Sequence, residues 1–149
     1  MKRQPVKLMQ HAAIALGLAL PASAALADSN PLIAERWKTR PVVVVVPQEG
    51  DPLLAKVRSA LKETAAREAF RERDMALYTV VSGKGTRNDR ALTPQQTEAL
   101  LKALQVDARG PATFLLVGKD GGVKMKQGAD VDLQAVFDEV DRMPMRQQR

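Results

Sequence analysis

Apolar and polar positions follow two patterns along the chain, unbroken apolar runs and helical repeats. Residues 41–46 place five consecutive valines after a proline, and an unbroken β-branched run is typical of a strand covered on both faces. Shorter apolar runs at residues 75–81 (MALYTVV) and 113–117 (TFLLV) predict two more strands. Residues 123–126 (VKMK) alternate, which is typical of an edge strand with one face in water. The pattern therefore predicts a four-stranded sheet.

Helical repeats of apolar residues separate these strands. Asp51 and Pro52 suit the cap and the first position of a helix, and we expect one helix to run from there through Phe70. Thr93 and Gln96 form a capping-box pattern, which predicts the start of a second helix.

A last helix is expected after the fourth strand. Asp130 or Asp132 is its predicted cap, and Met143-Pro144 is its predicted end, with a polar basic tail beyond. Its core face is expected to be formed by four residues at helical spacing: Leu133, Val136, Phe137 and Val140.

The remaining segments connect these elements. Residues 30–40 predict an arm or short helix, in which Trp37 is expected to be a packing anchor beside the first strand. Residues 82–90 (SGKGTRNDR) predict a polar loop, and residues 119–122 (KDGG) a hairpin turn. The resulting order is β-α-β-α-β-β-α, with a parallel first pair of strands and an antiparallel last pair. We therefore expect an α/β fold with a four-stranded mixed sheet and helices on both faces.

The first 27 residues have the layout of a secretory signal peptide. A basic start precedes an apolar run at residues 8–20, and a tail of small residues follows at residues 21–27. We expect cleavage before Asp28, a single domain at residues 28–149, and a periplasmic or secreted location. The apolar run is shorter than the roughly 20 residues of a membrane span. An uncleaved N-terminal anchor is therefore the less favoured alternative.

Removal of this leader changes both the charge and the available chemistry. It takes away three of the 23 basic residues and none of the 17 acidic ones, so the formal net charge falls from +6 to +3 and nucleic-acid binding is not expected. The only histidine, His11, lies in the leader, and the chain has no cysteine. Thiol redox chemistry, Cys/His zinc sites and a Ser-His-Asp triad are thereby excluded. We expect no catalytic residue, metal or cofactor, and we interpret Tyr78 as a packing residue.

A candidate binding site is expected where three loops converge at one end of the sheet. The loops are residues 47–52 (PQEGDP), 82–90 and 109–113 (RGPAT). A helix N-terminus beside basic side chains can hold an anion or a peptide carboxylate. The competing interpretation, ordinary caps and exposed charges, stays open. The residues of this predicted site are Glu49, Asp51, Lys84, Arg87, Arg90 and Arg109.

Four stretches of the sequence resemble a small exported bacterial family that is catalogued only as a domain of unknown function. They are RWKTRPVVVVVP (36–47), FRERDMALYTV (70–80), FLLVGKDGGVKMK (114–126) and LQAVFDEVDRMPMRQQR (133–149). The resemblance implies a thioredoxin-like fold related to the peroxiredoxins, and it extends to domains of animal sushi-repeat and coiled-coil-domain matrix proteins.

The chain departs from redox-active thioredoxin-like proteins at two places. Such proteins carry a Cys pair between the first strand and the first helix, where this chain has residues 47–52. They also have a cis-proline just before the third strand, and here Pro111 lies close to that place while Ala112 occupies it if Thr113 aligns.

Three hypotheses follow for the function. The first is a non-catalytic binding module for a protein or anionic ligand in the cell envelope. The second is a divergent redox or peroxide-handling protein that needs a cofactor or a partner thiol. The third is an envelope structural or stress protein tethered by its N-terminus, in which case the leader would be retained.

Overall fold

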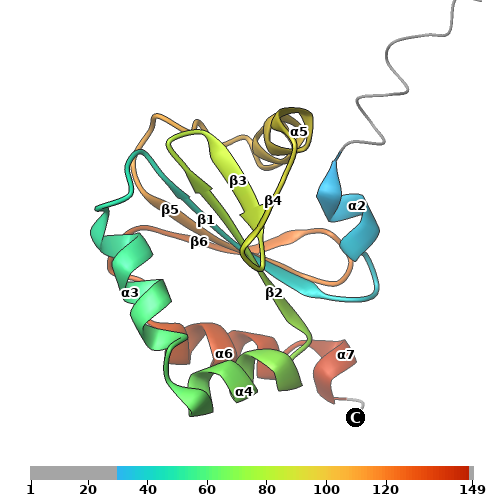
Figure 1. Cartoon of the computed structure of the whole chain (residues 1–149). Coiled ribbons are helices and arrows are strands. Elements are labelled where there is room, and N and C mark those ends of the chain that lie inside the picture. Colours follow the sequence, from blue (N-terminus) through green and yellow to red (C-terminus); the bar gives the residue numbers. More distant parts are fainter. Residues whose placement is uncertain (1–29, 148–149) are drawn as a thin grey trace, which may run out of the picture.

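The computed structural model describes residues 30–147, and the expected leader lies outside this range. Within it, a six-stranded mixed sheet has the order β4-β3-β2-β1-β5-β6, with helices on both faces (Figure 1). The strands are β1 (Arg40–Val46), β2 (Met75–Val81), β3 (Lys84–Arg87), β4 (Arg90–Ala91), β5 (Thr113–Val117) and β6 (Val123–Gln127). The helices are α2 (Pro31–Glu35), α3 (Pro52–Ala60), α4 (Thr64–Glu72), α5 (Pro94–Leu104), α6 (Leu133–Asp141) and α7 (Pro144–Gln147).

The strand directions agree with those expected from the sequence. β1 runs parallel to β2, antiparallel strands β5 and β6 continue the sheet on the other side of β1, and β6 forms one edge. The α/β class, the mixed sheet and the helices on both faces are therefore confirmed. The number of strands is not, because the sheet has six strands in the described residues and not four.

The two additional strands come from the segment predicted to be a polar loop. β3 pairs antiparallel with β2, and β4 pairs with β3. Tight turns make this possible: Ser82 and Gly83 have positive φ before β3, as do Asn88 and Asp89 between β3 and β4. Small residues and residues with hydrogen-bonding side chains tolerate that conformation, and these strands are too short and polar to show an apolar period.

The single long helix expected after Asp51 is in fact two helices. Asp51 caps α3 as predicted, its Oδ1 accepting from the Leu53 N–H at 2.9 Å, and Pro52 opens the helix. The chain then turns at residues 61–63 and restarts as α4, which leaves Arg67 beside the carbonyl groups at the end of α3. α3 buries apolar side chains, whereas α4 has no fully buried residue. The apolar residues keep a helical spacing across residues 61–63, so the sequence does not show that α3 and α4 are separate helices that differ in burial.

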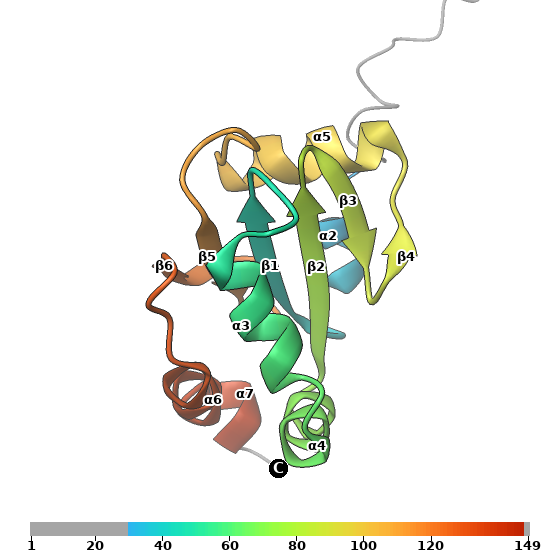
Figure 2. The ribbon, with the colours of Figure 1, turned by 60° about the vertical axis from the view of Figure 1, so that its left-hand side comes forward.

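The core lies on both sides of β1, every residue of which is buried. Val42, Val44 and Val46 pack under α3 and α6 in one cluster, while Val43 and Val45 belong to a second cluster under α5 and α2. Figure 2 shows α3 crossing in front of β1. The run of valines thus has the two-sided burial that its sequence predicts.

One smaller expectation is wrong. Trp37 is not a packing anchor: its side chain is 63% exposed, its φ is +65°, and its N–H donates to the Lys119 carbonyl at 2.7 Å. α6 ends at Asp141 with Arg142 as its C-cap, two residues before the predicted end at Met143-Pro144. Pro144 then begins the short helix α7, since proline suits the first turn of a helix.

Other expectations for the ends of elements are confirmed. Thr93 forms the capping box of α5, and Asp132, not Asp130, caps α6. No peptide bond in residues 30–147 is cis, so Pro111 is trans. None of the helices in that range is both long enough and apolar enough to cross a membrane.

Candidate functional site

The loops of the predicted site do come to one end of the sheet. Ser82 Oγ donates to the Pro47 carbonyl at 3.0 Å, which joins the first loop to the second. Thr113 lies opposite Val45, which brings the third loop to the same end. Glu49, Asp51, Lys84 and Arg109 lie on the segments that meet there.

Two of the six predicted residues lie away from that end. Arg87 is opposite Tyr78 in the middle of β2, and Arg90 lies across from Arg87 on the edge strand β4. Of the others, Glu49 pairs with Arg58 and Asp51 is the cap of α3. The structure therefore does not bring all six side chains together.

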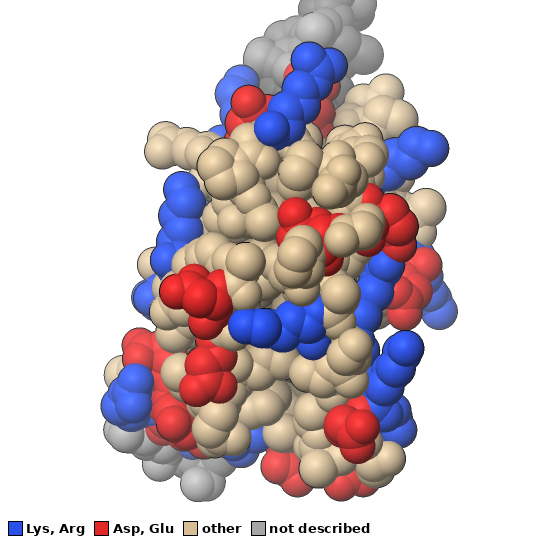
Figure 3. All heavy atoms as spheres, turned by 90° about the vertical axis from the view of Figure 1, so that its left-hand side faces the viewer, with Lys and Arg blue, Asp and Glu red and all other residues tan. Residues whose placement is uncertain are grey.

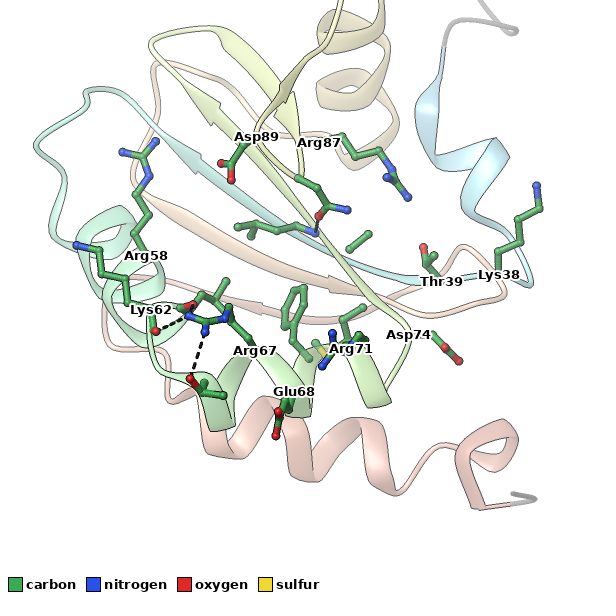
Figure 4. A pocket seen from close by; sticks show the side chains of 17 residues that line it. Lys38, Thr39, Arg58, Lys62, Arg67, Glu68, Arg71, Asp74, Arg87 and Asp89 are labelled. Atoms are coloured by element: carbon green, nitrogen blue, oxygen red, sulfur yellow. Dashed lines mark hydrogen bonds between the residues drawn. The ribbon is translucent and has the colours of Figure 1, made fainter.

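A groove with several basic side chains in its lining lies on another part of the surface. It has a volume of about 1010 Å³ and is enclosed by the end of α3, by α4, by the first half of β2, by the β3–β4 turn and by the segment before β1 (Figure 4). Its lining within the described residues has six basic side chains and three acidic ones. The basic residues are Lys38, Arg58, Lys62, Arg67, Arg71 and Arg87, and the acidic residues are Glu68, Asp74 and Asp89.

The basic side chains lie towards two ends of this groove. Arg58, Lys62 and Arg67 lie at the α3 end, where Arg67 Nη1 donates to the Lys62 carbonyl. Lys38 and Arg87 lie at the opposite end in Figure 4. One helical turn after Arg67, Arg71 lies between them, since residues four apart share a helix face.

Three of these basic groups are available to a ligand. Lys38, Lys62 and Arg71 are exposed and have no carboxylate partner within residues 30–147. The floor between the two ends is apolar, because Leu61, Phe70 and Leu77 are half-buried there and pack onto the core below α3. The groove thus combines an apolar floor with unneutralised positive charge.

A buried carboxylate holds Arg87 at one end of the groove. Glu35 of α2 is 5% exposed, and its Oε1 accepts from Tyr78 Oη at 2.7 Å and from Arg87 Nε at 2.5 Å. Its Oε2 accepts from Arg87 Nη2 at 3.3 Å and from Thr39 Oγ1. Burial by itself raises the pKa of Glu35, but the hydrogen bonds from Arg87, Thr39 and Tyr78 outweigh it and hold that pKa below its ordinary value.

The same contacts shift the titration of the two donors. Burial, and then the hydrogen bond to Glu35, raise the pKa of Tyr78 far above its ordinary value. The hydrogen bond and the charge of Glu35 raise the pKa of Arg87. Tyr78 has no exposed surface, so a ligand in the groove does not touch its hydroxyl. The contacts with Glu35 fix the position of Arg87 at the groove.

The face of the molecule that carries α3 has a mixed electrostatic character. Over α3, basic and acidic side chains alternate among uncharged ones, and no field of a single sign covers that face (Figure 3). In the part of the chain that the structure describes, no three His, Cys, Asp or Glu side chains are placed to hold a metal ion. The groove has twice as many basic as acidic side chains in its lining, which favours the approach of an anionic group.

Sequence reasoning found only Arg87 among the basic residues of the groove. The one usable signal was the spacing of Arg67 and Arg71, which places two cations on one face of a helix. This signal was missed because one continuous helix was expected from Asp51 through Phe70, with its charged side chains facing solvent. The contribution of Glu35 had no signal in the sequence, since its partners Tyr78 and Arg87 lie on distant strands.

Comparisons with known proteins give one match. The family described as "Domain of unknown function (DUF4174)" matches residues 31–149. No curated protein and no solved structure matches the chain. The match covers all but the first 30 residues, and it confirms the expectation of a family whose function is unknown. The chain belongs to the DUF4174 family.

Proposed function

We propose that this protein is an exported, non-catalytic binding domain that holds an anionic partner in the groove beside α4. The observation that carries the proposal is the position of Lys38, Lys62 and Arg71, three exposed cations around an apolar floor without acidic partners in the described range. Long-range attraction speeds the encounter with an anionic partner, and the floor supplies contact area.

The thioredoxin-like ancestry that the resemblance implies would be consistent with this function. The inner strands β2-β1-β5-β6 contain one parallel pair and two antiparallel pairs. By the resemblance, residues 47–52 stand where redox-active proteins of that fold carry thiols, and this chain has no cysteine. A redox function would need a partner thiol or a cofactor, and the groove is better suited to holding a ligand than to reacting with it.

A localised titration tests the proposal. Oligoglutamate is added to isotopically labelled protein, and amide shifts are followed in two-dimensional NMR spectra. We expect the shifts to gather on α4, on Lys38 and on the β3–β4 turn, and to disappear as salt is raised because exposed charges are screened.

Two triple variants with the same loss of charge provide the control. Changing Lys38, Lys62 and Arg71 to Ala should weaken oligoglutamate binding by about tenfold or more, on the scale of a few exposed charge contacts. Changing Lys84, Arg90 and Arg109 to Ala, all exposed and outside the groove, should leave it nearly unchanged. Equal weakening by both variants, or shifts gathered around Lys84 and Arg109, would overturn the groove as the site.

A further inference from the structure

The arrangement of charge along the groove restricts which anions it can hold. Glu68 and Asp89 lie between the two basic ends in Figure 4, on opposite sides of the groove. Both are exposed, and neither has a basic partner in the described part of the chain. A polymer with a negative charge at every unit would bring charge beside these carboxylates and be repelled in the middle.

The apolar floor lies in this same middle section. Phe70 precedes Arg71 on α4, and Leu77 of β2 is fixed opposite by the Asn88 turn, where the Leu77 N–H donates to Asn88 Oδ1 at 2.9 Å and the Leu77 carbonyl accepts from the Asn88 N–H at 2.7 Å. These half-buried side chains offer a surface on which an apolar side chain can pack. Each methylene group so buried contributes about 0.8 kcal/mol.

The exposed part of β2 and the volume of the groove favour an extended chain as the ligand. β3 pairs with β2 only from Tyr78 to Val81, so residues 75–77 of β2 face the groove where β3 has ended. A volume of about 1010 Å³ is at the upper limit of pockets for single small molecules, which span roughly 300–1,000 Å³. A segment of several residues fills this volume better than a compact ligand does.

The basic ends are suited to carboxylates in particular. Arg87 already holds the Glu35 carboxylate through two of its nitrogens, and Thr39 supports the same group. At the other end, Arg58 pairs with the Glu49 carboxylate. Planar guanidinium groups bind carboxylates through paired hydrogen bonds. Beside these two arginines, Lys62 and Lys38 each add an ammonium group without a carboxylate partner in the described residues, and Arg71 lies between the two ends.

We propose that the partner is an extended protein segment with acidic residues at both ends and large apolar side chains between them. This inference rests on the proposed function and names the class of its ligand. The carboxylates of the segment meet the two basic ends of the groove, and its apolar centre packs on Phe70 and Leu77. Glu68 and Asp89 make the binding of uniformly charged polyanions, such as oligoglutamate, weaker than that of this segment.

Three labelled peptides of equal length and equal net charge test the inference by fluorescence anisotropy. One has paired acidic residues at both ends and Phe-Leu in the centre, the second has the same residues with the acidic ones in the centre, and the third is a glutamate-glycine repeat. We expect the first to bind at least tenfold more tightly than the other two.

A substitution at Glu68 supplies a second test, because that residue is exposed and its replacement does not disturb the core. In Glu68→Lys the preference for the first peptide should fall severalfold, as binding of the other two becomes stronger. Equal affinities in the parent protein, or tighter binding of inorganic polyphosphate than of the first peptide, would overturn the segment proposal and leave the anion-binding function intact. Binding of none of these probes would overturn both.

Discussion

At the scale of single residues, Glu35 determines how the N-terminal helix meets the sheet. Burying a carboxylate is costly unless several donors compensate, and Glu35 has donors from Thr39, Tyr78 and Arg87. These donors come from the segment before β1 and from two strands, so one side chain joins α2 to β2 and β3. The same contacts fix the position of Arg87 at the groove.

Replacement of Glu35 should change how stability depends on pH. The pKa of Glu35 is lower in the folded chain than the value of about 4.3 in an unfolded chain. Ionised Glu35 therefore contributes stability above about pH 4.3, and that contribution is lost as pH falls through the folded pKa. Glu35→Gln should lower the free energy of unfolding at pH 7 by about 2 kcal/mol, less than a fully buried pair because Arg87 is partly exposed.

Urea denaturation at several pH values between 7 and 3 measures this effect. We expect the loss of stability on acidification to be smaller in Glu35→Gln than in the parent protein. Glu98→Gln, an exposed change on α5, is the control and should follow the parent curve. A Glu35→Gln curve parallel to the parent would contradict the role given to this carboxylate.

Trp37 provides a second residue-scale prediction. Its φ of +65° places an L-residue in the left-handed region, which costs about 1–2 kcal/mol relative to glycine, partly offset by the greater freedom of glycine in the unfolded chain. Trp37→Gly should therefore be more stable than Trp37→Ala by about 1 kcal/mol, as measured by urea denaturation followed by circular dichroism. The two variants both remove the exposed indole and differ only in the β-carbon. Equal stabilities would show that the backbone carries no such cost.

At the scale of elements, the β3–β4 hairpin depends on its contact with α5. Gly85 of β3 is buried, and a β-carbon there would collide with Thr97 Oγ1 and lie 3.0 Å from Leu92 Cδ1. Thr97 cannot easily move, because it is buried and its hydroxyl donates to the Thr93 carbonyl at 3.1 Å. The strand can lie under α5 only because this position has no side chain.

Gly85→Ala should accordingly destabilise the protein by about 1–3 kcal/mol, the usual cost of overpacking. Gly50→Ala is the matched control, since a β-carbon at Gly50 meets no atom within 4 Å, and it should change the stability by much less. Thermal unfolding of the two variants and the parent compares them directly. Equal effects would mean that the close approach of α5 to β3 is not required.

Element-scale predictions from sequence succeeded where the signal is local. The limits of β2 and β5 were correct to the residue, and the caps at Asp51 and Thr93 were confirmed, because apolar runs and capping residues act over a few neighbouring positions. The break between α3 and α4 was missed. Nothing within residues 61–63 forbids a helix as a proline would, and the turn is fixed by contacts such as Arg67 with the Lys62 carbonyl.

At the scale of the whole molecule, β1 joins two cores into one cooperative unit. Val43 faces the cluster under α5, and its neighbour Val44 faces the cluster under α3 and α6. Arg73 adds a link between elements on the side of α3 and α6. Its guanidinium contacts Asp141 at 2.8 and 3.0 Å and lies over the Phe137 ring. Loss of packing on one face of β1 should therefore also destabilise the packing on its other face.

Val43→Ala and Val44→Ala test this cooperativity. Each should cost roughly 2 kcal/mol, the scale for removing buried methyl groups, and each should shift a single unfolding transition. Fluorescence of Trp37, the only tryptophan, and far-ultraviolet circular dichroism should give the same midpoint in both variants. Separate midpoints in either variant would show that the two faces unfold independently.

The sequence alone determined the α/β class, the inner four strands and the helix caps, because each rests on residues close together in the chain. Only the tertiary structure decided the β3–β4 hairpin, the exposure of Trp37 and the groove. The Glu35 contacts illustrate the reason, since its partners Tyr78 and Arg87 are 43 and 52 positions away. Which distant charges meet is set by how the sheet and helices pack, and no periodic pattern in the sequence records it.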